Sequence, residues 1–112
     1  MTKTLTETEI DEFKTNGAIL VKNAVEPDWV ERMNEVVQNQ LDHPSSWAND
    51  GNPGYAQDRM FTDRYLWQHN EEIKAYIYQS GCAQLAAQAM QSSTARFYFD
   101  HLLVKGPGTP AV

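Results

Sequence analysis

Apolar side chains recur every three or four positions from Val30 to Leu41. This spacing places them on one face of a helix. Pro27 suits the first turn of such a helix, and Pro44 is incompatible with its continuation. The pattern therefore predicts an amphipathic helix from about Pro27 to Asp42.

A shorter helix is predicted near the start of the chain from its end signals. Thr6 and Glu9 have the spacing of a capping box, and Leu5 and Ile10 have that of a hydrophobic staple. Gly17 suits the left-handed position that follows a helix. The helix is expected to end at about Asn16.

The second half of the chain predicts two further helices. Asn70 is a favourable cap for a helix that continues to Ile77, and Ser80 and Gly81 interrupt it. The alanine-rich segment Cys82–Met90 forms the next helix. The polar, glycine- and proline-containing segment 44–60 is expected to be a long loop.

Two segments are predicted to be strands. Ala18–Val21 is a short apolar run typical of a buried strand, and Ala95–Val104 is longer and densely apolar. The element order is helix, strand, helix, loop, helix, helix, strand, which indicates an α+β fold. Two distant strands rarely form a stable sheet alone. The final strand has no partner nearby, so further strands are expected beyond it to cover its edges and faces.

Because side chains alternate along a strand, the residues of this final segment divide between two faces. His101, Leu103 and Lys105 are predicted to share one face. Tyr98 and Asp100 point to the other side, where packing or capping roles are expected.

Composition excludes several classes of function. The chain has 112 residues, which suits one domain, and a formal net charge of -6 without any cluster of Lys or Arg. A nucleic-acid partner is therefore not expected. No apolar run reaches the roughly 20 residues that span a bilayer, and the N-terminus lacks a secretory signal. The single cysteine, Cys82, agrees with a cytoplasmic location.

The segment 96–110 reads RFYFDHLLVKGPGTP. It resembles a strand of the phytanoyl-CoA dioxygenase family, which in bacterial members reads D-x-L-L-V-K-x-P-G-T and is followed shortly by W-H-x-D. Phe13–Val21 is similar to the opening segment of that family, Phe61–Gln68 to the segment before its middle helix, and Cys82–Met90 to its alanine-rich helix. The resemblance extends, in order, over nearly all of the chain.

The resemblance implies a double-stranded β-helix, also described as a jelly-roll or cupin-like fold, of which residues 1–112 are the N-terminal part of a single domain with an incomplete barrel. It implies an Fe(II)- and 2-oxoglutarate-dependent dioxygenase that hydroxylates a small-molecule substrate with O2. The iron motif is expected just after Val112. No catalytic or metal-binding residue is therefore expected in this chain, which is predicted to be inactive alone and to bind neither cofactor tightly.

The same resemblance places His101 and Lys105 beside 2-oxoglutarate, although the family more often has glutamine at the position of His101. The alternative function is that of a non-catalytic α+β binding or interaction module. Two other groups suggest different chemistry but have simpler explanations. His69 and Glu71 have His-x-carboxylate spacing, but the intervening Asn70 is explained more simply as a helix cap. Cys82 is expected to be a small packing residue.

Overall fold

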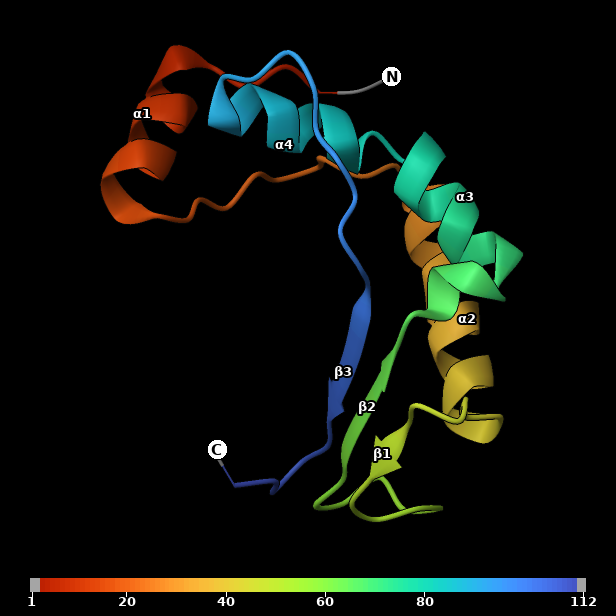
Figure 1. Ribbon diagram of the computed structural model, residues 1–112. Helices are drawn as coiled ribbons and strands as arrows, with labels where there is room; N and C mark the ends of the chain where they lie inside the picture. Colours follow the sequence, from red (N-terminus) through yellow and green to blue (C-terminus); the bar gives the residue numbers. More distant parts are fainter. Residues whose placement is uncertain (1–2, 111–112) are drawn as a thin grey trace. The chain divides into compact units, whose positions relative to one another are not determined.

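Along the described residues, two helices are followed by two short strands, three further helices and a last strand. In the computed structural model, which describes residues 3–110, the α-helices are α1 (Glu7–Asn16), α2 (Pro27–Asp42), α3 (Glu71–Gln79) and α4 (Cys82–Met90). A 3-10 helix, η1 (Leu66–Gln68), precedes α3, and the strands are β1 (Asn49–Asp50), β2 (Met60–Arg64) and β3 (His101–Lys105) (Figure 1). The predicted α+β class is confirmed. None of the helices within residues 3–110 has the length and apolar character needed to cross a membrane.

The described chain divides into two compact units. The first comprises residues 3–32 and 75–98, and the second comprises residues 33–74 and 99–110. Helices α2 and α3 each contribute residues to both units. Each unit has its own contacts, and the two are described in turn.

In the first unit, α1 has the predicted ends. The Thr6 side chain accepts a hydrogen bond from the Glu9 backbone N–H, and the Glu9 carboxylate accepts one from the Thr6 N–H, both at 3.1 Å. Gly17 adopts a left-handed conformation (φ 77°), and its N–H donates to the Phe13 carbonyl at 2.8 Å. Because both ends of the helix satisfy their orphan backbone groups, α1 begins and ends where the sequence indicates.

A glutamine of α4 holds the segment before α1. The Gln88 amide oxygen accepts a hydrogen bond from the Leu5 N–H (2.6 Å), and its amide nitrogen donates to the Lys3 carbonyl (3.1 Å). Gln88 thus pairs with the backbone as a neighbouring strand would. Leu5 is buried, and α1 packs against α4.

The predicted strand Ala18–Val21 is not a strand in the structure. The segment has no secondary structure, and Leu20 is 81% exposed. A strand requires a partner for its backbone groups, and the described residues provide none here. Ile19 and Val21 instead line an apolar cavity of about 360 Å³ together with Leu85 of α4.

Helices α2, α3 and α4 lie where the sequence predicts them. The Asn70 side chain caps α3 by accepting hydrogen bonds from the N–H groups of Glu72 (3.0 Å) and Ile73 (3.1 Å). This geometry confirms the role expected of Asn70. Ser80 and Gly81 separate α3 from α4, and Gly81 takes a left-handed conformation that favours glycine (φ 90°).

The second unit contains a three-stranded antiparallel sheet in the order β1-β2-β3. In its register, Arg64 pairs with His101, Thr62 with Leu103 and Met60 with Lys105. Strand β1 pairs with the other edge of β2. Figure 1 shows the three strands side by side in the lower part of the picture.

The sheet corrects three predictions. Strand β2 and the short β1 were missed, since β1 and Met60 fall in the predicted loop 44–60. The final strand is not without a partner, because β3 pairs along its whole length with β2. It also begins at His101 rather than Ala95. Since β2 ends at Arg64 and Tyr65 turns into a left-handed conformation (φ 59°), β2 provides no residues with which 95–99 can pair.

Candidate functional site

The alternation of side chains gives the sheet two different faces. Directly opposed residues of antiparallel strands point to the same side. One side carries Phe61 and Asp63 of β2 with Leu102 and Val104 of β3, and we call it the covered face. The other side, which we call the open face, carries Met60, Thr62 and Arg64 with His101, Leu103 and Lys105.

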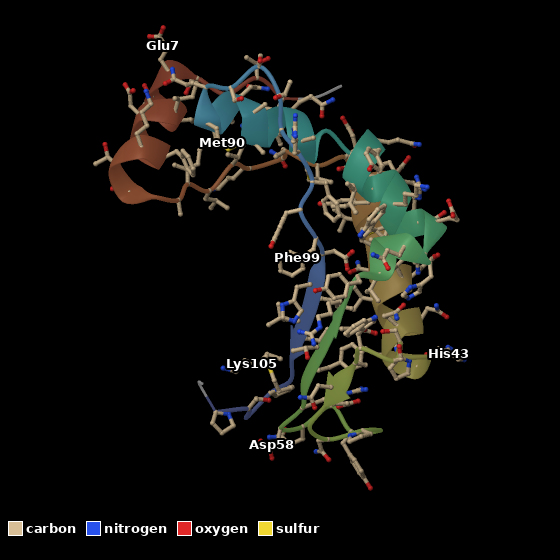
Figure 2. The ribbon with its side chains drawn as sticks, viewed as in Figure 1. Glu7, His43, Asp58, Met90, Phe99 and Lys105 are labelled. Carbon is tan, nitrogen blue, oxygen red and sulfur yellow. The ribbon has the colours of Figure 1, made fainter. Side chains whose placement is uncertain are left out.

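The open face brings the predicted site residues together. His101, Leu103 and Lys105 alternate with less exposed neighbours along β3, and all three side chains are exposed. The prediction that they share one face is therefore confirmed. Figure 2 labels Lys105 at the end of β3 and Phe99 just before its start. Leu103, between the two basic residues, is 55% exposed.

Arg64 adds a third basic group that sequence analysis did not identify. It is exposed and lies opposite His101 in the register. The open face carries no Asp or Glu, whereas the whole chain has a net charge of -6. Positive charge is therefore concentrated on this face of an acidic chain, which favours an anionic ligand there.

Aromatic rings continue the open face beyond the start of β3. Tyr65 packs edge-on against Trp47, with centroids 5.2 Å apart, and lies 6.0 Å from Phe99. Phe99 in turn lies 6.4 Å from the His101 ring. The Arg64 guanidinium is 5.5 Å from the Trp47 ring, within the range of a cation–π contact. One end of the face is thus aromatic, and Lys105 lies at the other.

The covered face is held by a buried carboxylate. Asp63 is fully buried and accepts hydrogen bonds from the Gln40 amide (3.0 Å), the Ser45 N–H (2.9 Å), the Ser45 hydroxyl and the Arg64 N–H (2.9 Å). Burial alone would raise the pKa of Asp63, but these hydrogen bonds outweigh it and lower the pKa. These hydrogen bonds join α2 and the segment after it to β2. Because one of them comes from the Arg64 N–H, they also fix the backbone of Arg64 from the covered side of the sheet.

Asp100 fixes the other strand. Its two carboxylate oxygens accept hydrogen bonds from the N–H groups of Leu66 (2.9 Å) and Trp67 (3.0 Å), which caps η1. The capping role expected for Asp100 is confirmed. Tyr98 was expected to pack or cap as well, but its side chain is 89% exposed and does not enter a core. The difference follows from the pairing, which begins only at His101.

A glycine-containing turn fixes the backbone after Lys105. The Gly106 N–H donates to the Arg59 carbonyl (2.7 Å), and the Asp58 N–H donates to the Pro107 carbonyl (2.8 Å). A Cβ atom at Gly106 would lie 2.0 Å from the Ala56 carbonyl oxygen, so only glycine allows this approach. Arg59 is held in turn by a salt bridge to Asp50 at 2.7 Å.

The rival groups do not assemble into a site. Asn70 is used as a helix cap, as expected, and within residues 3–110 no group of three or more His, Cys, Asp or Glu is placed to hold a metal ion. Cys82 is partly exposed and donates a hydrogen bond to the Tyr76 hydroxyl at 3.3 Å. The open face is therefore the best-supported candidate site.

Arg64 was missed because MFTDR does not alternate between apolar and polar residues as a half-buried strand usually does. The sequence feature that could have indicated strand β2 was the spacing of Phe61 and Asp63, which places both side chains on one face, but an aspartate is recognised as buried only once its hydrogen-bond donors are known.

Comparisons of the chain with models of known protein families, with curated proteins and with solved structures gave no match.

Proposed function

We propose that this chain forms the cosubstrate-binding wall of an Fe(II)- and 2-oxoglutarate-dependent oxygenase similar to the phytanoyl-CoA dioxygenase family. In this proposal the open face is the inner wall of a double-stranded β-helix. The observation that supports it most is the presentation of His101, Leu103 and Lys105 together on an uncovered face. Leu103 and Lys105 also belong to the segment that carries the family resemblance, whereas the family more often has glutamine at the position of His101.

The open face suits 2-oxoglutarate by its chemistry. The cosubstrate is a dianion with a short methylene chain between two carboxylates. Lys105 supplies an ammonium group for one carboxylate, and Leu103 supplies apolar surface for the methylenes. His101 lies two residues before Leu103 and is the second group that we assign to the cosubstrate.

The role proposed for this chain concerns the cosubstrate, and among residues 3–110 no group of three or more His, Cys, Asp or Glu is placed to hold a metal ion. In the complete reaction, 2-oxoglutarate and O2 are converted to succinate and CO2 while a substrate C–H bond becomes C–OH. The chain's own residues would bind and orient 2-oxoglutarate and exclude water around it. The small-molecule substrate and the cytoplasmic location expected from the sequence belong to the same proposal.

The experiment is a titration of the 112-residue chain with 2-oxoglutarate, followed by two-dimensional NMR. We expect weak binding, with a Kd on the order of 1 mM, and amide shifts centred on β3. Replacing Lys105 with Ala should weaken binding about tenfold, because a hydrogen bond to a charged group contributes roughly 1.5–3 kcal/mol.

Lys74→Ala is the matched control, since Lys74 is an exposed lysine of α3 outside the open face. His101→Gln should retain binding, because glutamine preserves hydrogen bonding at that position. Equal loss in the Lys74 and Lys105 variants would reject the site, and so would shifts that avoid β3. Full oxygenase turnover by this chain with added Fe(II) would contradict the assignment of the iron ligands to other residues.

The second candidate is a non-catalytic module that binds a partner through the sheet. One observation favours it: within residues 3–110, the edge of β3 that faces away from β2 has no strand partner. Such an edge can pair with an extended peptide. Sedimentation and NMR of the chain discriminate between the two. A stable monomer with a dispersed spectrum and no response to 2-oxoglutarate favours the module.

A further inference from the structure

A second cavity lies in the first unit and shares no lining residue with the open face. It is bounded by Tyr76 and Ile77 at the end of α3, by the first turns of α4, and by the segment 95–97. Its volume is about 280 Å³, close to the lower end of the roughly 300–1,000 Å³ usual for small-molecule sites. All of its walls belong to the same compact unit.

The walls of this cavity are mainly apolar. Ile77, Ala83, Ala86, Ala95 and Phe97 supply most of the surface, with three polar side chains among them. The three lining residues with polar side-chain groups are Tyr76, Cys82 and Arg96. Among the described residues that line it there is no Asp or Glu, so the charge in the walls is that of a single cation.

Two of these side chains are hydrogen-bonded to each other. The Cys82 thiol donates to the Tyr76 oxygen at 3.3 Å, which leaves the phenol's own proton to be donated elsewhere. The Tyr76 ring is held on its other side by Trp29, with centroids 5.8 Å apart and the rings nearly perpendicular. Burial, followed by the neighbouring Cys82, raises the pKa of Tyr76 to about 12. A tyrosine hydroxyl is protonated at neutral pH even at its ordinary pKa of about 10, so it can donate a hydrogen bond to a bound anion.

We propose that this cavity binds a small monocarboxylate with an apolar body, such as a short-chain fatty acid. The carboxylate pairs with Arg96 and accepts the hydrogen bond of the Tyr76 hydroxyl. The chain of the acid lies against the alanines of α4 and Phe97. Arg96 is the one charged residue of the lining and favours an anion, whereas a dianion would place its second charge against apolar walls.

Cys82 is the only cysteine of the chain, so its modification reports directly on occupancy. The experiment measures the rate at which a thiol reagent labels Cys82 in the 112-residue chain as hexanoate is added. At hexanoate concentrations about ten times Kd, labelling should slow about tenfold, because only the unoccupied fraction reacts. Hexanol, which has the same chain and no charge, should protect far less.

Variants identify the groups that bind the acid. Arg96→Gln should weaken hexanoate binding about tenfold, and Tyr76→Phe should weaken it by a smaller factor. Lys14→Gln is the control, because Lys14 is an exposed cation of α1 in the same unit and does not line the cavity. A circular dichroism spectrum of each variant establishes that it is folded.

Three results would overturn the proposal: no protection at about 50 mM hexanoate, well above the millimolar range of weak sites; equal protection by hexanol and hexanoate; or equal weakening by Arg96→Gln and Lys14→Gln. If a variant is unfolded, the comparison of hexanoate with hexanol on the unmodified chain still decides the matter. None of these outcomes depends on whether 2-oxoglutarate binds the open face.

Discussion

The two faces of the sheet are built from alternate residues of the same two strands, yet they differ in almost every physical respect. On the covered face, Phe61 and Asp63 are fully buried. On the open face, Leu103 is 55% exposed and its neighbours are basic. The covered face therefore stabilises the fold, whereas the open face is available for chemistry. Changes on the first should be felt as lost stability, and changes on the second as lost binding.

The largest effect is expected at Phe61. Replacing it with Ala should lower the free energy of unfolding by about 3–5 kcal/mol, because a fully buried aromatic ring leaves a cavity. The control is Phe99→Ala, which removes a phenyl ring that is exposed beside the open face. It should lower the free energy of unfolding by less than about 1.5 kcal/mol, the usual contribution of an aromatic contact. Urea denaturation measures both. Equal losses would remove the distinction between the faces. If Phe61→Ala does not fold, Phe61→Leu provides a smaller change at the same position.

Asp63 should give the next largest effect. Asp63→Asn should lower stability by about 1–3 kcal/mol, because an amide cannot accept all four hydrogen bonds that the carboxylate accepts. The measurement is the urea midpoint at pH 7. Arg64→Gln, at the adjacent open-face position, should leave the midpoint nearly unchanged.

The same residue predicts a pH dependence. Because folding lowers the pKa of Asp63, its stabilising contribution is present above the unfolded pKa of about 3.9 and is lost as the pH falls through the folded pKa. The parent chain should therefore lose stability below about pH 4 more steeply than Asp63→Asn does. Parallel curves of melting temperature against pH, measured from pH 7 to 2, would show that the buried carboxylate is not responsible.

The helices were predictable from the sequence because their determinants are local. Thr6, Gly17 and Asn70 each satisfy backbone groups within a few residues of themselves. The sheet was not predictable to the same extent. Strand β2 pairs with residues about 40 positions away, and its buried Asp63 is explained only by donors from Gln40 and Ser45.

The candidate site likewise has one part that follows from local sequence and one part that depends on distant residues. Period-two alternation within β3 was enough to predict that His101 and Lys105 share a face. Arg64 joins them only through the register of a strand that was not recognised. The prediction of a strand at Ala18–Val21 was wrong for a related reason, since an apolar run forms a strand only where a partner strand is present.

Gly106 follows the last residue of β3, and its N–H donates to the Arg59 carbonyl at 2.7 Å, which fixes the turn at the end of the sheet. Gly106→Ala should lower stability by about 1–3 kcal/mol, since the new methyl group would meet the Ala56 carbonyl oxygen and force the turn to shift. Gly51→Ala is the control. There the added methyl makes only ordinary contacts, at 3.6 Å from the Met60 carbonyl oxygen, so stability should change by less than about 1 kcal/mol. Similar losses for the two variants would mean that Gly106 is not specially constrained.

The smallest effect on stability is expected at Leu103. Leu103→Ser should change the free energy of unfolding of this chain by no more than about 0.5 kcal/mol, because the side chain already lies largely in water. A loss above about 1.5 kcal/mol in urea denaturation would mean that the open face is packed in solution, since that is the lower end of what burying a leucine contributes. The same variant should weaken 2-oxoglutarate binding if Leu103 contacts its methylenes. A change in binding without a change in stability is the result that separates the open face from the covered one.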